Sequence, residues 1–232
     1  MSETPRLAWL FDVDGTLLST EGAAREAFTR AVSQSLGVTD DLRDIAFAGR
    51  TEPLILKDIL AKHGARFADG EEALFWDRVF VAMRAALRPP RGRLLPGVEA
   101  LLDRIGGEPG WVTGLLTGNM TEMARIKLDR FGIGPRFAFG AFGEEAADRN
   151  ALARVAVERV RRAYGIPPAR CVVVGDTEYD IACARAAEAR AVAVATGTQS
   201  RDLLESRGPD LLLDDLSDPS ALLAWARSVA AA

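Results

Sequence analysis

The sequence predicts an α/β protein: a Rossmann-like parallel sheet core with helices on both faces, plus an all-helical cap domain inserted after the first strand. A short apolar run, Leu7–Phe11, predicts a buried strand near the start of the chain. Helical periodicity then fills the next stretch, and after Pro96 strands alternate with helices, a pattern typical of right-handed βαβ units. We expect the core to comprise residues 1–20 and 96–232, and the cap domain residues 21–95.

The inserted segment is predicted to be helical because its apolar residues recur every three or four positions. Its end is predicted at "RPPRGRLLPG", whose prolines and glycines indicate a connection. We interpret Phe47, Trp76 and Phe80 as packing residues of this segment, in preference to aromatic side chains that stack on a ligand. The periodic groups are Ala24, Ala27, Phe28, Ala31 and Val32; Leu54, Ile55, Ile59 and Leu60; and Leu74, Phe75, Val79, Phe80 and Met83.

The core segment supplies the remaining strands and helices. Strands are predicted at "WVTGLLT", "RFAFGAF", "CVVV", "AVAVAT" and "PDLLLDD", with helices after each of the last two. The other helices are predicted at residues 98–105, 120–131, 150–164 and 181–187.

The composition of the chain favours an ordinary globular protein. Its 232 residues are 48% hydrophobic and 27% charged, so a packed core is expected. The net charge of -4, with scattered basic residues, predicts no nucleic-acid partner. "MSETPRLAWLF" lacks the features of a signal peptide or membrane span, and two cysteines suit a reducing compartment, so we expect a cytoplasmic protein without a membrane partner. The oligomeric state is not predicted.

The single histidine, His63, restricts the possible chemistry. One histidine excludes a histidine-rich metal site and disfavours a Ser-His-Asp triad. We interpret His63 as a helix-end residue because Gly64 follows it and cations suit helix C-termini.

Polar side chains follow three of the predicted strands. Each group alone could be a turn or a helix cap, but the carboxyl ends of parallel strands meet at one edge of a sheet, so we expect a shared site. Clustered carboxylates repel one another unless a cation lies among them, and oxygen ligands are typical of Mg²⁺. We therefore predict Mg²⁺ as the cofactor. The residues are Asp12 and Asp14; Thr117, Gly118 and Asn119; and Asp176 and Asp180.

Three of these segments resemble motifs of the haloacid dehalogenase superfamily. "FDVDGTLL" is similar to its first motif, "LLTGN" to its second and "VVVGDTEYDI" to its fourth. "LLPGVEALLDRI" and "VATGTQSRDLLESRGPDLLLDDL" resemble connecting segments of the phosphoglycolate-phosphatase-like branch, so the resemblance spans nearly the full chain. It implies a Mg²⁺-dependent phosphatase that removes phosphate from a small phosphorylated metabolite through an aspartyl-phosphate.

The resemblance also implies a role for each acidic residue. Asp12 would attack phosphorus and bind the metal. Asp14 would protonate the leaving oxygen and later deprotonate water, while its backbone carbonyl binds the metal. Asp176 would be a direct metal ligand, and Asp180 a ligand or a partner of one. Thr117 would donate a hydrogen bond to the transferring phosphoryl group.

The third motif of the superfamily is a lysine or an arginine that supplies a fixed cation. No lysine follows Lys127, so we favour Arg149, at the start of the helix before "CVVV", over the alternative of a solvated helix-start arginine. Lys127 is a second candidate, unless it lies on an exposed helix face. Arg50, in a loop between cap helices, is predicted to bind the substrate, with a solvated loop residue as the alternative. Gly118 and Asn119 are also predicted to bind the substrate.

Other activities share some of these motifs. A sugar-phosphate mutase of the β-phosphoglucomutase type has the same core, but its first cap helix carries a histidine that "EGAAREAF" lacks. A haloacid dehalogenase has no need of a second acid such as Asp14. A binding module without activity is disfavoured because the acidic residues are all present. The sequence does not distinguish phosphoglycolate, a sugar phosphate, a nucleotide or pyrophosphate as the substrate.

Overall fold

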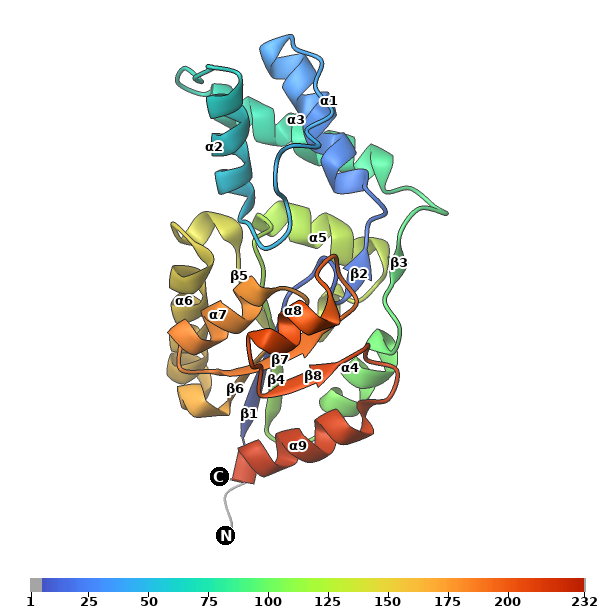
Figure 1. The fold of residues 1–232 in the computed structure, drawn as a ribbon, viewed down its shortest axis with the longest axis vertical. Coiled ribbons are helices and arrows are strands. Elements are labelled where there is room, and N and C mark those ends of the chain that lie inside the picture. Colours follow the sequence, from blue (N-terminus) through green and yellow to red (C-terminus); the bar gives the residue numbers. More distant parts are fainter. Residues whose placement is uncertain (1–5, 232) are drawn as a thin grey trace.

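The computed structural model describes residues 6–231, and its centre is a six-stranded parallel sheet (Figure 1). This confirms the α/β core expected from the alternating pattern. Residues 1–5 and 232, which the predicted core includes, lie outside the described residues. In spatial order the strands are β5 (Phe139–Ala141), β4 (Trp111–Leu116), β1 (Leu7–Phe11), β6 (Cys171–Gly175), β7 (Arg190–Val194) and β8 (Leu211–Leu213).

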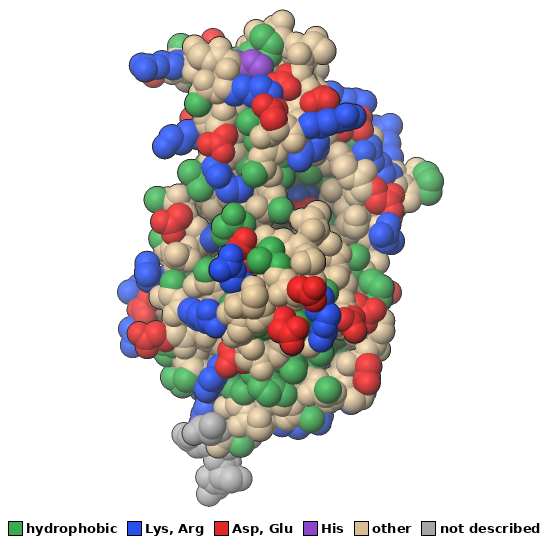
Figure 2. Space-filling view, in the orientation of Figure 1, with side chains coloured by type: hydrophobic (Ala, Val, Ile, Leu, Met, Phe, Trp, Pro, Cys, Tyr) green, Lys and Arg blue, Asp and Glu red, His purple; other side chains and the backbone are tan. Residues whose placement is uncertain are grey.

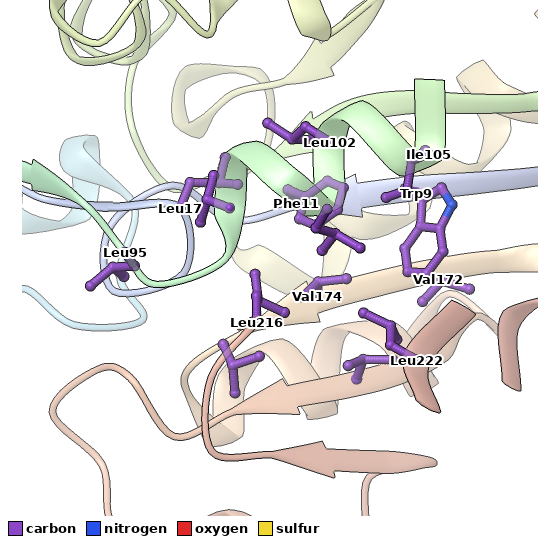
Figure 3. Close-up of a cluster of buried hydrophobic side chains, with 14 of the residues drawn as sticks. Trp9, Phe11, Leu17, Leu95, Leu102, Ile105, Val172, Val174, Leu216 and Leu222 are labelled. Carbon is purple, nitrogen blue, oxygen red and sulfur yellow. The ribbon is translucent and has the colours of Figure 1, made fainter. Parts of the chain in front are cut away.

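Helices cover both faces of the sheet, as predicted, and β1 lies at its centre with all of its residues buried. Because successive side chains of a strand point to opposite faces, Trp9 and Phe11 pack on one face, where α4 and α9 lie (Figure 3). Ala8 and Leu10 pack on the other face, against α6 and α7. These helices are α4 (Val98–Gly106), α6 (Arg149–Tyr164), α7 (Glu178–Ala186) and α9 (Pro219–Ala231).

The helical insert lies between two short strands and packs around an apolar cluster that also includes Met123 and Ile126 of the core. That cluster includes Phe28, Ile59 and Phe75, and the insert lies over one end of the sheet domain (Figure 1). The predicted domain boundaries, after residue 20 and before residue 96, stay predictions. The elements are β2 (Leu18–Ser19), α1 (Ala23–Leu36), α2 (Glu52–Lys62), α3 (Glu71–Ala86) and β3 (Arg93–Leu94).

A two-stranded ribbon, which the sequence did not predict, joins the insert to the core. β2 and β3 are antiparallel, with Leu18 opposite Leu94 and Ser19 opposite Arg93. The carboxylate of Glu21 lies 2.5 Å from the guanidinium of Arg93. The two connecting segments therefore lie side by side.

The other differences from the predicted elements are local. α7 begins three residues earlier than predicted because Thr177 and Asp180 form a capping box around its first turn. Within "RFAFGAF" only three residues form a strand. The remaining elements are α5 (Thr121–Arg130), η1 (Gly134–Arg136), η2 (Gly143–Glu145), η3 (Pro168–Arg170) and α8 (Arg201–Ser206).

His63 ends α2, which confirms its interpretation as a helix-end residue, and its Nε2 lies 2.8 Å from Asp40 Oδ2. On the face drawn in Figure 2, acidic and basic side chains are interspersed, in agreement with the scattered charges of the sequence. Among residues 6–231, no helix has the length and apolarity that crossing a bilayer requires.

Candidate active site

The carboxyl ends of β1, β4 and β6 open into a cavity of about 400 Å³ between the sheet and the insert. This is the edge at which ligands bind in open α/β sheets. Predicted site residues from all three strand ends line the cavity, so the expectation that these segments meet is confirmed. They are Asp12, Asp14, Thr117, Gly118, Asn119 and Asp176.

Three buried carboxylates form a tight cluster at the base of the site. One carboxylate oxygen from each of Asp12, Asp176 and Asp180 lies within 4.8 Å of the other two. Burial raises the pKa of Asp12 and of Asp176, and the charge of Asp180 raises both further. A divalent metal ion would stabilise the ionised carboxylates, and the all-oxygen donor set fits such an ion. The carboxylate of Asp14 is not part of this cluster.

The residues that follow Asp14 hold Asp176 in place. Gly15 has a φ of +81°, and a Cβ atom there would lie 2.4 Å from Asp176 Oδ2, so a larger residue would displace that carboxylate. Thr16 Oγ1 donates a hydrogen bond to Asp176 Oδ1 at 3.1 Å. Thr196 Oγ1 donates to the Gly15 carbonyl at 2.6 Å. The "DGT" segment thus supports a carboxylate of the acidic cluster that follows another strand.

Arg149 is the first residue of α6, and its side chain points inward. It is 8% exposed, its Nη2 lies 3.6 Å from Asp12 Oδ1, and it contacts Asp180. Asp148 caps the helix by accepting a hydrogen bond from the N–H of Ala151, which fixes where α6 begins. The alternative of a solvated helix-start arginine is therefore wrong.

Lys127 is also buried, with a side chain that is 2% exposed. Its Nζ lies 2.6 Å from Asp14 Oδ2 and 2.5 Å from Asn119 Oδ1. The alternative of an exposed helix face is therefore wrong, because Lys127 lies on the buried side of α5 with Met123 and Ala124. Its spacing of three and four residues from those apolar positions was the sequence signal for burial. Two fixed cations are thus present, one beside Asp12 and one beside Asp14.

The residues after β4 form a hydrogen-bonded loop beside Asp14. Asn119 Nδ2 donates to Asp14 Oδ2 at 2.8 Å and to Thr117 Oγ1 at 2.7 Å. Because the Thr117 oxygen accepts this bond, its own proton stays available for a ligand in the cavity. A Cβ atom on Gly118 would lie 2.1 Å from the Arg50 carbonyl oxygen, so this loop packs directly against the insert.

Two charged residues at the start of α2 and just before it lie in the part of the cavity wall that the insert supplies. Arg50 lines the cavity and its guanidinium lies 2.5 Å from the carboxylate of Asp58. Glu52, which the sequence did not identify, is buried at the start of α2 and accepts a hydrogen bond from the N–H of Met120 at 2.8 Å. Burial raises the pKa of Glu52 to about 7.

Comparison with known proteins identifies the family. The model of the haloacid dehalogenase-like hydrolase family matches residues 8–188. The chain belongs to this family. As a haloacid dehalogenase-like hydrolase it is an enzyme, and the resemblance that the motifs predicted is confirmed.

Several relatives of this hydrolase are named as phosphatases. A phosphoglycolate phosphatase of Xanthomonas campestris pv. campestris (strain 8004) is 31% identical over 202 residues, covering 84% of this chain and 86% of the relative. A putative pyrophosphatase, PpaX, of Caldanaerobacter subterraneus subsp. tengcongensis is 26% identical over 213 residues, 90% of each chain. The crystal structure of CbbY from Rhodobacter sphaeroides in complex with phosphate has a TM-score of 0.75 at 22% identity, covering 93% of this chain and 96% of that one. The CbbY likeness shows the fold.

The hydrolase also contains site residues that its motifs did not reveal. Thr16 lies within the first motif, so its place in "DGT" was a usable signal. No sequence signal identified Thr196 or Glu52. Their positions depend on how a distant loop and the insert fold back onto the sheet.

Proposed function

We propose that this hydrolase is a Mg²⁺-dependent phosphatase that removes phosphate from a small phosphorylated metabolite through an aspartyl-phosphate on Asp12, in the manner of a phosphoglycolate phosphatase. The observation that supports this most strongly is the position of Asp12. Its carboxylate belongs to the acidic cluster, lies 3.6 Å from the guanidinium of a buried arginine and lines the same cavity as Asp14.

In the first step, the Asp12 carboxylate attacks phosphorus and the bond between phosphorus and the substrate oxygen breaks. The electron pair leaves with that oxygen, and Asp14 supplies the proton that makes it a hydroxyl group. Arg149 and the Thr117 hydroxyl donate hydrogen bonds to the phosphoryl oxygens, whose charge spreads in the transition state.

In the second step, water attacks the phosphorus of the aspartyl-phosphate. Asp14, now ionised, takes a proton from that water as the acyl-phosphate bond breaks. Inorganic phosphate leaves and the Asp12 carboxylate is restored, so the cycle consumes one ester and one water.

The metal would be held by Asp12, Asp176, the backbone carbonyl of Asp14, and Asp180 either directly or through a neighbour. When bound, Mg²⁺ neutralises the carboxylates and polarises a phosphoryl oxygen. The buried oxygen donors suit it because Mg²⁺ prefers oxygen ligands and usually binds substrate phosphates as well.

The cavity wall limits the class of substrate. Cationic Arg25 and Arg50 line the cavity together with apolar Phe47 and Ile55. Arg25 stacks over the Phe47 ring, with its guanidinium carbon 4.3 Å from the ring centroid. Phe47 is therefore part of the substrate wall as well as a packing residue of the insert. These groups suit a compact metabolite with polar or anionic substituents beyond the phosphate.

The proposal is tested by hydrolysis of p-nitrophenyl phosphate with Mg²⁺ and with excess chelator. We expect turnover with the metal and none with the chelator, and full activity in chelator would contradict the proposal. A panel of phosphoglycolate, sugar phosphates, nucleotides and pyrophosphate, assayed by phosphate release, then identifies the preferred substrate.

A further inference from the structure

Lys127 has no role in the mechanism above, although its ammonium group is buried next to the residue that moves the proton. We propose that Lys127 is a positioning residue: it holds one oxygen of the Asp14 carboxyl group so that the other oxygen faces the substrate. This inference rests on the proposed phosphatase function.

The side-chain hydrogen bonds of Asp14 involve one of its two carboxylate oxygens. Its Oδ2 accepts hydrogen bonds from Lys127 Nζ at 2.6 Å and from Asn119 Nδ2 at 2.8 Å. In the described part of the chain, Oδ1 of Asp14 has no hydrogen-bond donor, while the side chain is 41% exposed and lines the cavity. The carboxyl group is therefore fixed through Oδ2, and Oδ1 is the oxygen that can exchange a proton with the substrate or with water.

The surroundings of Lys127 make it a rigid anchor. Its side chain is one of the buried side chains of α5, and its Nζ donates hydrogen bonds to both Asp14 and Asn119. Asn119 in turn donates to Asp14 and to Thr117, so the three polar groups around Asp14 fix one another. A side chain in such a network has little freedom to move toward a bound phosphate.

The two buried cations serve different carboxylates. Arg149 contacts Asp180 and lies 3.6 Å from Asp12, on the side of the acidic cluster. Lys127 forms its ion pair with Asp14 and, among residues 6–231, has none with a member of that cluster. This division assigns phosphate binding to Arg149 and orientation of the proton-transferring group to Lys127.

Loss of the anchor should slow the steps that need the proton and spare phosphate binding. A carboxyl group held in its reactive orientation avoids the entropy cost of reaching it, and proton transfer by such a group is worth about a hundred- to ten-thousand-fold. In a Lys127→Met variant Asn119 still holds Asp14, so the proton transfer should be weakened but not abolished. We therefore expect turnover to fall by about ten- to a hundredfold, which is less than the complete loss of proton transfer would cause.

The test follows p-nitrophenyl phosphate and an alkyl phosphate by stopped flow in the Mg²⁺-loaded Lys127→Met protein. The aryl oxygen leaves without a proton, so we expect a burst of one nitrophenolate per enzyme followed by slow turnover, since only the second step needs Asp14. The alkyl phosphate should give no burst. The inhibition constant of inorganic phosphate should stay within about threefold of the wild-type value, less than the loss of one charged hydrogen bond would cause.

Two variants complete the test. Lys57→Met removes an exposed lysine of α2 and should behave as the wild type. Lys127→Gln retains a hydrogen-bond donor for Asp14 and should recover part of the turnover. It also carries the test if circular dichroism shows that Lys127→Met does not fold.

Two results would overturn the inference. An inhibition constant of phosphate raised tenfold or more, without a burst, would make Lys127 a phosphate-binding cation. Wild-type kinetics in a folded Lys127 variant would show that Lys127 does not position Asp14 for proton transfer and has a structural role only. Failure of the proposed function is distinguishable from both, because the wild-type protein itself would then fail to hydrolyse p-nitrophenyl phosphate.

Discussion

Glu52 accepts a hydrogen bond from the backbone N–H of Met120 at 2.8 Å, which joins a buried carboxyl group of the insert to the start of α5. Burial raises the pKa of Glu52 to about 7, although the charge of Lys127 acts in the opposite direction. The unfolded chain releases this proton near pH 4.5, so the folded protein binds one more proton between about pH 4.5 and 7. The contribution of Glu52 to the free energy of unfolding therefore falls as the pH rises through that window.

We predict that Glu52→Gln removes this pH dependence. Glutamine keeps an acceptor for the Met120 N–H and cannot ionise. The free energy of unfolding of the variant, relative to wild type, should rise between pH 5 and pH 8 by up to about 3 kcal/mol. Urea denaturation in metal-free buffer at both pH values measures it. Glu205→Gln, at an exposed position in α8, is the control, and a constant difference for Glu52→Gln would contradict the prediction.

We predict that Mg²⁺ stabilises the fold through the acidic cluster. At about one hundred times its dissociation constant, the metal should raise the free energy of unfolding by about 2.7 kcal/mol, or the Tm by roughly 5–10 °C. Asp176→Asn should show little of this shift. In chelator the variant should be more stable than wild type, because it removes one of three mutually repelling carboxylates. Differential scanning fluorimetry gives both values, and an equal Mg²⁺ shift in the two proteins would exclude Asp176 as a ligand.

We predict opposite behaviour for the two carboxylates of the first motif. Asp12→Asn should abolish turnover, since an amide does not attack phosphorus. Asp14→Asn should still be phosphorylated by an aryl phosphate but hydrolyse the aspartyl-phosphate about a hundredfold or more slowly. Intact mass spectrometry should then find one added phosphoryl group on the Asp14 variant alone. An acyl-phosphate on Asp12→Asn protein would show that another residue is the nucleophile.

We predict that Arg149→Met weakens phosphate binding. The guanidinium is buried beside Asp12, and a hydrogen bond to a charged group contributes about 1.5–3 kcal/mol, so the inhibition constant of phosphate should rise about ten- to a hundredfold. Lys127→Met should leave that constant nearly unchanged. If the two variants exchange these properties, the roles of the two cations are reversed.

We predict that Gly118→Ala separates the insert from the core. The new Cβ atom would lie 2.1 Å from the Arg50 carbonyl oxygen, and the backbone of Glu52 donates to Gly118 at 2.8 Å, so the contact cannot relax locally. We expect a loss of about 1–3 kcal/mol and a higher KM. Gly106→Ala, which meets no atom within 4 Å, is the matched control and should be neutral or stabilising by about 0.5–1 kcal/mol. A Gly118→Ala protein as stable as Gly106→Ala would disprove the contact.

The sequence predicted those parts of the fold and site that depend on local pattern. The apolar run Leu7–Phe11 predicted a buried strand, and acids at the ends of β1 and β6 were expected to meet because parallel strands end at one edge of a sheet. The neighbours of each carboxylate were not predictable in the same way. Whether Arg149 pointed inward depended on the packing of α6 against α7, β4 and β5, and that packing is a property of the folded molecule.

Lys127 shows where sequence reasoning can fail. A lysine on a helix is usually solvated, so an exposed position was a reasonable alternative for Lys127. Its spacing from the apolar residues Met123 and Ala124 indicated burial instead. The ribbon of β2 and β3 was missed for a different reason: two residues are too few to show an alternating pattern. Glu52 became visible only once α2 lay against the loop after β4.

The pairing of Ser19 with Arg93 brings the start and the end of the insert together at one point of the sheet domain. An inserted segment whose two ends lie side by side can be lengthened, shortened or exchanged in evolution without moving the strands of the core sheet. The carboxylates of the core can therefore be inherited unchanged while the wall that carries Arg50 and Phe47 diverges. New substrates would then be acquired by altering one continuous stretch of the gene.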